Sequence, residues 1–367
     1  MKKKILFIQP YYFSGGHPFQ SFNNLILNLL KYDKYDFLVS INNHIKEKNF
    51  IKDFNIINKK KKIFTYNSSP KSSSNLNVYK AFLKTFIMKK KYDLFFYYDV
   101  NLNITSFLYV LFNIFFKKKI IVIYVLFGPE KIFQSKIRLY FFKLFLRLGN
   151  TKIVTRTIEL EKSWKKSFNN FKWKINHIPP IDFPKLNNFN NIRKGNLSFG
   201  SVGQIRFGKS LEFLNSFFKK NKKYNFSIIG GYANKQSKES SSFLEKKFLI
   251  SNRTFLTFNE IIKAAAKLDY IILLYDKFFD KRNEVSTLYL AAKLGIPIIC
   301  FKNNSWLYKQ LKIFKFGYSI KSLKEFSNFP KRNSKKYKSY IRGLKKLNKN
   351  VFKIKVNERS MEKILFS

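Results

Sequence analysis

Three loops in this sequence carry residue types that bind phosphate groups or move protons. The first contains Gly15, Gly16 and His17, between a short apolar run and an amphipathic stretch. Paired glycines let the backbone approach a ligand closely, and the N-terminus of a following helix favours an anion. His17 has the side chain that titrates nearest to neutral pH. The loop is either an anion site or a plain tight turn, and a lone loop histidine is often only a surface residue.

The second loop runs from Gly203 to Ser210, again between an apolar run and a helical pattern. Arg206 and Lys209 bring two cations to the start of the expected helix, where backbone N–H groups also favour an anion. We do not interpret the loop as the phosphate loop of nucleoside triphosphatases, because the context of a long following helix is incomplete. The Gly-x-Gly-x-x-Gly fingerprint of dinucleotide sites is absent. A diphosphate fits this chemistry, and solvated surface charges are the alternative.

The third loop holds Glu284, Ser286 and Thr287 and leads into an expected helix over 288–294. A hydroxyl residue at this boundary is an ordinary N-cap, which any helix can use. The same hydroxyls and the N–H groups of the first turn could instead bind a phosphate. This segment by itself leaves both interpretations open.

The elements that must position these loops alternate between short β-branched or aromatic runs and longer helical patterns. This alternation is typical of βα units around parallel sheets. We expect strands at 4–9, 37–41, 63–66, 94–98, 120–126, 152–155, 175–178, 197–202, 225–229, 254–257, 270–274, 297–301 and 318–320. We expect helices at 19–30, 78–89, 102–116 and 131–148.

The domain organisation follows from a polar, Asn-rich stretch near the middle of the chain. The sequence predicts an N-terminal domain over 1–184, a linker over 185–196, a second domain over 197–330 and a basic helical segment over 331–367. Each domain is expected to be α/β, Rossmann-like and doubly wound. In such sheets ligands bind beyond the carboxyl ends of the strands, where all three loops fall.

The net charge of +51, from 72 Lys and Arg against 21 Asp and Glu, is the most unusual property of the composition. It is spread over the whole length without a helix-turn-helix, zinc-finger or RNA-binding pattern, so we do not expect a dedicated nucleic-acid binder, which stays the third interpretation. Base composition explains most of the lysine. Peripheral contact with an anionic membrane stays open as a use of the charge. The expected helix over 131–148 fits this use or ordinary core packing, since Lys136, Lys143 and Arg147 lie beside Ile137, Phe141, Leu144 and Leu148.

Other features indicate an intracellular protein. The only cysteine, Cys300, lies in an apolar run, so we expect its thiol to be buried in the core. The apolar run after Met1 is too short for a signal peptide. Lys117 to Lys119 divide the apolar stretch over 104–127 into two pieces, each too short to span a membrane. The sequence therefore predicts a cytoplasmic protein, with the inner face of the plasma membrane as a peripheral location.

Taken in order, the loops resemble the group 1 family of retaining glycosyltransferases with the GT-B fold. Members of that family open with a strand and a Gly-Gly loop, as in 5–16, and begin the second domain with a strand, Gly-Arg and a later lysine, as in 201–209. A strand ending in Gly230-Gly231 and a strand-turn-helix over 254–260 follow. The segment 290–299, Leu-Ala-Ala-Lys-Leu-Gly-Ile-Pro-Ile-Ile, is similar to the family's Leu-Glu-Ala-Met-Ala-x-Gly-x-Pro-Val-Val.

The sequence departs from the family pattern at several positions. The family's two glutamates fall on Arg282 and Leu290, with Glu284 two positions from the first. Gln204 stands where the family has a phosphate-binding arginine, for which Arg206 can substitute. The family's His-Gly-x-Glu run becomes Phe-Gly-Pro-Glu at 127–130, which keeps Glu130 and loses the histidine. Ser286 and Thr287 resemble a variant in which Ser-Gly or Ser-Thr replaces the glutamate segment.

The resemblance implies transfer of a sugar from a nucleotide diphosphate-sugar to a glycan or lipid-linked acceptor, in the synthesis of cell-envelope polysaccharide. Gly15, Gly16, Gly203, Arg206, Lys209, Glu284, Ser286 and Thr287 would bind the donor, and His17 and Glu130 would bind or deprotonate the acceptor. The sequence has no Asp-x-Asp and three scattered histidines, so we expect no metal and no cofactor besides the donor. A catalytically inactive GT-B-like protein that binds a glycan or nucleotide is the alternative. An NAD enzyme would need the absent glycine fingerprint.

Overall fold

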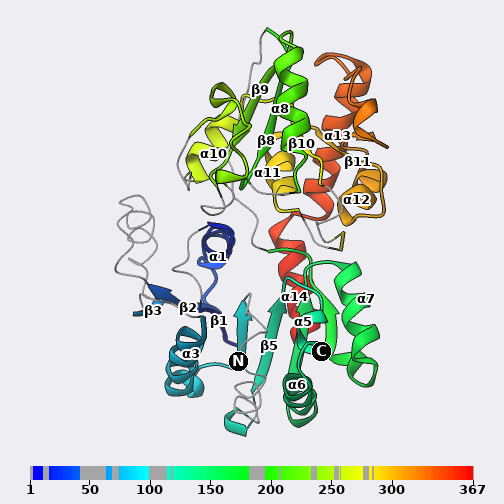
Figure 1. Ribbon diagram of the computed structural model, residues 1–367. Coiled ribbons are helices and arrows are strands. Elements are labelled where there is room, and N and C mark those ends of the chain that lie inside the picture. Colours follow the sequence, from blue (N-terminus) through cyan, green and yellow to red (C-terminus); the bar gives the residue numbers. More distant parts are fainter. Residues whose placement is uncertain are drawn as a thin grey trace. The chain divides into compact units, whose positions relative to one another are not determined.

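The chain forms two compact units in the computed structural model (Figure 1). Unit 1 combines Met1–Lys185 with Ile354–Ser367, and unit 2 is Leu186–Lys353. The structure describes residues 3–10, 16–41, 63–67, 74–98, 114–116, 119–181, 195–205, 208–232, 238–251, 256, 258–275, 281–282 and 285–366.

Unit 1 is built on a parallel sheet with the order β3-β2-β1-β4-β5-β6-β7 among its described strands. The strands are β1 (Ile5–Gln9), β2 (Tyr35–Ile41), β3 (Ile63–Asn67), β4 (Leu94–Tyr98), β5 (Ile120–Val125), β6 (Thr151–Thr155) and β7 (Ile175–His177). The connecting α-helices are α1 (Gly16–Leu29), α3 (Ser74–Met88), α5 (Glu130–Phe133), α6 (Lys136–Leu148) and α7 (Ile158–Ser167), with 3₁₀ turns η2 (Lys89–Lys91) and η3 (Asn169–Lys174). The strand order reverses between β1 and β4, which makes the sheet doubly wound.

The central strands of this sheet are buried on both faces. Every residue of β1 and β4 is buried, as expected for strands covered by helices on both sides. On one face α3, residue 116, α6 and α7 pack together in one core cluster. On the other face α1 packs with the last helix of the chain, α14 (Ile354–Phe366).

Helix α14 completes unit 1 through apolar and polar contacts. Met361 and Leu365 are fully buried in the core cluster with α1. Tyr35 Oη donates to Glu358 Oε1 at 2.9 Å, and Lys34 Nζ forms ion pairs with Glu358 and Glu362. Burial and these carboxylates raise the pKa of Tyr35 well above its usual range, so the phenol stays a donor.

We expect Met361→Ala to lower the free energy of unfolding by about 2–5 kcal/mol, because it leaves a cavity beneath α14. Val356→Ala on the same helix is the matched control, since Val356 is 41% exposed. Urea unfolding followed by tryptophan fluorescence measures both. Equal losses in the two variants would show that α14 does not depend on its buried face.

Unit 2 repeats the architecture with the order β12-β11-β10-β8-β9, again parallel. The strands are β8 (Ser198–Val202), β9 (Asn225–Ile229), β10 (Tyr270–Leu273), β11 (Ile298–Phe301) and β12 (Gly317–Ile320). The helices are α8 (Leu211–Lys220), α10 (Phe258–Ala265), α11 (Thr287–Leu294), α12 (Trp306–Phe314) and α13 (Lys335–Asn350), with 3₁₀ turns η4 (Lys246–Phe248) and η5 (Leu323–Glu325). The order reverses between β8 and β10. Cys300 lies buried in β11, and burial raises the pKa of its thiol to about 12.

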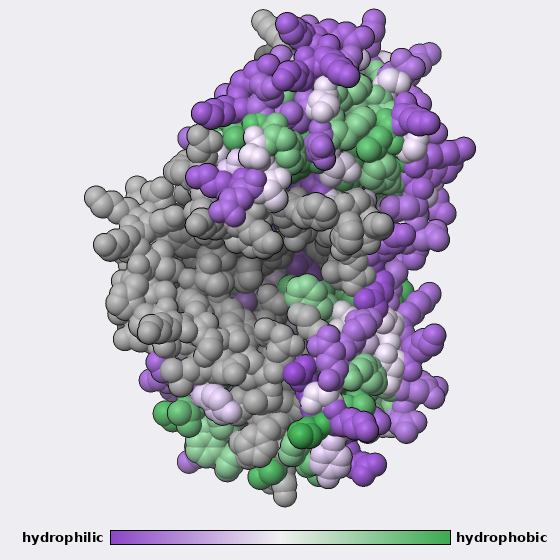
Figure 2. Space-filling view, viewed as in Figure 1, coloured by the Kyte–Doolittle hydropathy of each residue, from purple (hydrophilic) through white to green (hydrophobic). Residues whose placement is uncertain are grey.

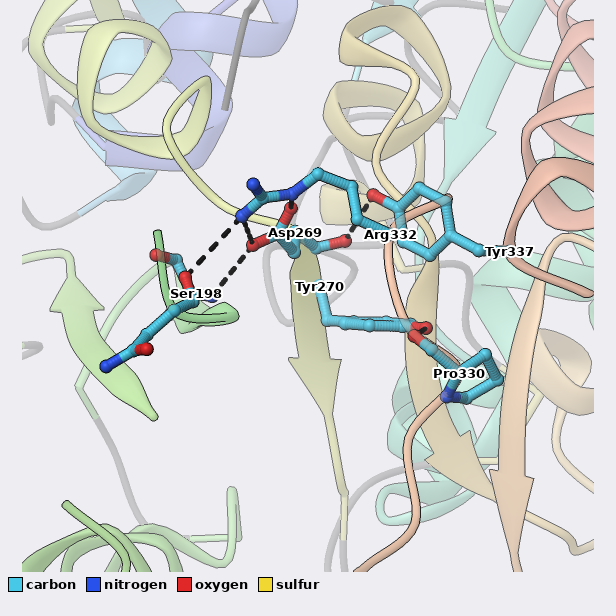
Figure 3. A network of polar contacts seen from close by, with 7 residues as sticks. Ser198, Asp269, Tyr270, Pro330, Arg332 and Tyr337 are labelled. Carbon is cyan, nitrogen blue, oxygen red and sulfur yellow. Dashed lines mark hydrogen bonds and ion pairs between the residues drawn. The ribbon is translucent and has the colours of Figure 1, made fainter. Parts of the chain in front are cut away.

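A buried ion pair fixes the segment before α13 to the amino end of this sheet (Figure 3). Asp269 is fully buried, and its two carboxylate oxygens accept from Arg332 Nε at 2.6 Å and Nη2 at 2.7 Å. The Ser198 backbone N–H donates to the same carboxylate at 2.8 Å, and Tyr337 Oη donates to the Asp269 carbonyl at 3.1 Å. The carboxylate raises the pKa of Arg332 further. The fork-shaped pairing holds β8, β10 and α13 together at the edge opposite the loops.

Arg332→Ala should lower the free energy of unfolding by about 3–5 kcal/mol, because it leaves a buried carboxylate without its cation. Chemical denaturation at pH 7 measures the change, and Arg332→Lys should recover only part of it. Glu245→Gln, which removes the exposed pair with Lys219, is the control and should change little. Equal effects for the buried and the exposed pair would contradict this role.

The expected elements are largely confirmed. Twelve of the expected strands coincide with described strands to within two residues at either end, whereas most of the strand 254–257 and most of the helix 102–116 lie outside the described residues. The continuous helix over 131–148 is wrong: Ser135 is extended, its hydroxyl accepts from the Arg138 N–H, and it caps α6 as a separate helix. Nor is 331–367 one segment, because α13 belongs to unit 2 and α14 to unit 1. None of the described helices is long and apolar enough to cross a membrane.

Candidate nucleotide-sugar site

The loop after β8 turns sharply and runs close to the end of β9. Gly203 has a φ of 100°, which favours glycine, and its N–H donates to the Ile229 carbonyl at 2.9 Å. A Cβ on Gly230 would lie 2.0 Å from the Gly203 carbonyl oxygen, so only glycine fits at Gly230. Gly230 therefore lets the β8 loop pass close to the end of β9.

Three of the predicted donor residues meet at this turn. Lys209 is buried, with only 7% of its surface exposed. Its Nζ donates to the Val202 carbonyl at 3.0 Å. A Cβ built on Gly203 would lie 3.2 Å from Lys209 Nζ and 3.7 Å from Thr287 Oγ1. Gly203 therefore lies directly beside the Lys209 ammonium and the Thr287 hydroxyl. This point lies at the carboxyl end of β8, at the reversal of strand order where α/β sheets bind ligands.

Helix α11 presents its N-terminus at the same place. Ser286 has helical backbone angles and makes no side-chain cap bond, so it is not the ordinary N-cap that the sequence left open. The N–H groups of Leu288 and Tyr289 donate to the carbonyls of Val285 and Ser286. An anion at this helix end would therefore use the N–H groups and hydroxyls of Ser286 and Thr287.

The letters from Gly203 to Ser210 fit Gly-x-x-x-x-Gly-Lys-Ser, yet the backbone is not that of a phosphate loop entering a helix. Ser210 is left-handed with a φ of 50°, and α8 begins only at Leu211. Lys209 and Ser210 therefore precede the helix instead of forming its first turn.

The remaining predicted residues are placed only in part. Gly15, Arg206 and Glu284 lie outside the described residues. Gly16 and His17 form the first turn of α1, after β1, and the exposed Glu130 begins α5, after β5. The ends of β1 and β5 are separated by β4, or about 10 Å at the usual strand spacing. His17 and Glu130 thus share an edge of the sheet of unit 1.

Sequence reasoning missed a buried polar group at that same edge. Gln9 at the end of β1 is fully buried, and Arg156 directly after β6 is only 5% exposed. His177 Nε2 donates to the Arg156 carbonyl at 3.1 Å, and burial lowers the pKa of His177, so the ring favours its neutral form. An arginine directly between a buried strand and the Thr157 N-cap was the available signal.

Within the described ranges, no three His, Cys, Asp or Glu side chains gather closely enough to hold a metal ion. The groups at the β8 turn are instead a cation, hydroxyls and backbone donors. This set can neutralise and orient a phosphate or diphosphate.

Comparison with known proteins gives structural likeness alone. No protein-family model and no curated protein sequence match this chain. A glycosyltransferase from Rickettsia africae is similar in structure, with a TM-score of 0.68 and 12% identity over 100% of this chain and 99% of that one. WaaG, a glycosyltransferase involved in lipopolysaccharide biosynthesis, has a TM-score of 0.62 and 10% identity over 99% of this chain and all of that one.

A third similar structure is UDP-GlcNAc 2-epimerase from Neisseria meningitidis bound to UDP-GlcNAc. Its TM-score is 0.53 and its identity 12%, over 99% of both chains. The two glycosyltransferases cover both units of this chain along their whole lengths. The predicted fold class is therefore confirmed: the chain has the GT-B architecture of two Rossmann-like units, each with a doubly wound parallel sheet.

Proposed function

We propose that this protein transfers a sugar from a nucleotide diphosphate-sugar to a glycan or lipid-linked acceptor in cell-envelope polysaccharide synthesis. The observation that carries the proposal is the convergence of Gly203, Lys209 and Thr287 at the carboxyl end of β8. These residues bring together an ammonium, a hydroxyl and a helix N-terminus. That chemistry is suited to a diphosphate.

Lys209 would stabilise the leaving diphosphate as the glycosidic bond breaks. Negative charge grows on that group in the transition state, and a fixed, buried cation stabilises it without reorganising. The N–H groups and hydroxyls of Ser286 and Thr287 would bind a second phosphate oxygen. Arg206 and Glu284 complete the proposed donor site.

Unit 1 would bind the acceptor. His17 and Glu130 lie at the carboxyl edge of its sheet and could bind or deprotonate a hydroxyl. Gly15 and Gly16 would let the backbone approach the donor. We propose transfer of a hexosyl group with retention, as in the family that the loops resemble.

A uridine diphosphate-sugar is the first donor to test, because structurally similar proteins include an epimerase bound to UDP-GlcNAc and a co-structure with UDP. We further propose that transfer needs no metal and no other cofactor, since the sequence has no Asp-x-Asp. The protein would act in the cytoplasm, in peripheral contact with the inner face of the plasma membrane.

A catalytically inactive nucleotide- or glycan-binding protein is the second candidate. Leu290, at the position of one family glutamate, is buried in α11 and cannot supply a carboxylate. Thermal-shift screening of nucleotide sugars followed by product analysis separates the candidates. Binding at 100 times the dissociation constant adds about 2.7 kcal/mol of stability. Binding with transfer supports the enzyme, and binding without transfer or hydrolysis supports the second candidate.

Lys209→Met should lower kcat/KM for the nucleotide sugar about a hundredfold or more, because the apolar side chain keeps the length of lysine and removes its charge. Steady-state kinetics with the donor found by screening measures the loss. Lys220→Met, at the exposed end of α8, is the matched control and should keep wild-type kinetics. Wild-type turnover by Lys209→Met would overturn the assignment of the diphosphate site.

Gly203→Ala should weaken nucleotide binding at least about tenfold, because its methyl group would lie 3.2 Å from Lys209 Nζ and must push the ammonium aside by a few tenths of an ångström. Gly195→Ala is the matched control: Gly195 also has a positive φ, of 78°, and a Cβ there meets nothing within 4 Å. Both variants carry the left-handed backbone cost of about 1–2 kcal/mol. Isothermal titration with the nucleotide compares them, and equal affinities would contradict the proposed site.

A further inference from the structure

Helices α3 and α6 of unit 1 carry large apolar side chains that point away from the core. On α3, Leu83 is 60% exposed and Ile87 76% exposed. On α6, Ile137 is 71% exposed and Tyr140 64% exposed. The inner residues of both helices pack on the same face of the sheet, in one core cluster. The exposed residues therefore lie on the outer side of one helical layer.

Residues 114–116 extend the apolar surface beside α3. Phe116 is buried in the core, whereas Ile114 and Phe115 are about half exposed. The Phe115 ring lies 5.2 Å from the Phe86 ring and 6.1 Å from the Phe82 ring. The half-exposed Phe115 ring therefore continues the apolar side chains of α3 and is not an isolated surface residue.

Basic residues surround these apolar groups without acidic ones. The sequence contains no Asp or Glu over 74–92, 114–119 or 136–148. The nearest acid along the chain, Asp93, accepts from the Lys4 backbone N–H at 2.8 Å. We define the basic apolar face by its exposed members on these elements: Leu83, Lys84, Ile87, Lys90, Ile114, Phe115, Lys136, Ile137, Tyr140, Lys143, Arg147 and Leu148.

Basic side chains of both helices lie next to apolar or aromatic ones. Lys89 Nζ lies 4.0 Å from the centre of the Phe86 ring, at the end of α3. On α6 the basic stripe Lys136, Lys143 and Arg147 runs beside the apolar residues. In Figure 2 hydrophobic and hydrophilic residues alternate along the lower edge of this unit, where Figure 1 places α3 and α6. This is the side-chain order of a lipid interface, with apolar groups in the acyl boundary and ammonium groups at the phosphates.

Helix α13 of unit 2 carries positive charge without exposed large apolar side chains, and it serves as a comparison. It is at least as basic, with exposed Lys338, Lys345 and Lys349, but its large apolar residues Leu344 and Leu347 are buried in its own unit. A solvated basic helix therefore accounts for α13. The basic apolar face differs because it adds exposed apolar area to the positive charge.

We propose that the basic apolar face binds an anionic lipid bilayer. The positive charge without acidic neighbours complements anionic headgroups, and the exposed Ile, Leu, Phe and Tyr side chains gain from burial at the acyl boundary. The proposal deepens the peripheral location given above by assigning it to α3, 114–116 and α6. It does not depend on the transfer activity, which is measured separately by product analysis.

Flotation of the full chain with vesicles tests the proposal. The protein should float with phosphatidylcholine vesicles containing 30 mol% phosphatidylglycerol and stay behind with phosphatidylcholine alone. Neutralising Lys84, Lys143 and Arg147 to Gln should lower the partition coefficient on the order of a hundredfold, at roughly 1 kcal/mol per basic residue. Ile87→Ser with Ile137→Ser, which keeps the charge, should also lower it at least about tenfold.

The matched control neutralises Lys338, Lys345 and Lys349 of α13 to Gln, with the same change of net charge. It should keep nearly wild-type flotation. Circular dichroism and the thermal shift with nucleotide verify that every variant is folded. The proposal is overturned if the wild type does not float with anionic vesicles, if the α13 variant loses as much as the α3 and α6 variant, or if the Ile double variant binds like wild type.

Discussion

Parallel pairing of the strands is the constraint on which the rest of this molecule depends. Because β8, β9 and β10 run in the same direction, the segments that follow them emerge at one edge of their sheet. The Gly203 turn and α11 therefore meet although more than 80 residues separate them. The cost is crowding at that edge, and Gly203 and Gly230 are the residues that relieve it. The opposite edge carries the Asp269–Arg332 pair, which serves packing rather than ligand binding.

Much of the fold could be predicted from the sequence, since buried parallel strands are short runs of β-branched and aromatic residues. Such runs as Ile120–Val125 need no partner to be recognised. The loop at Gly203 and the end of helix α11 before Gly295 could be predicted for the same reason, because each depends on the conformation of the local backbone. In these cases the information lies within a few residues, where pattern reasoning is strongest.

Other features could not be predicted because their partners are distant in sequence. Arg332 looks like any surface cation until Asp269, 63 positions earlier, is found buried beneath it. Met361 and Leu365 find their apolar surroundings on α1, more than 300 residues away, and on the sheet of unit 1. The candidate site divides in the same way: Lys209 and Thr287 were predicted from loop chemistry, whereas buried Arg156 was missed. The roles of His17 and Glu130 stay predictions.

The return of the chain from unit 2 to unit 1 has a consequence for synthesis on the ribosome. All the residues of unit 2 are translated before Met361 and Leu365 leave the exit tunnel, so unit 2 can fold while unit 1 still lacks α14. During that interval the apolar surface formed by α1 and the sheet is uncovered, at a length where exposed hydrophobic surface promotes aggregation. The nascent chain therefore exposes this surface throughout the synthesis of unit 2, until the residues of α14 are available to cover it.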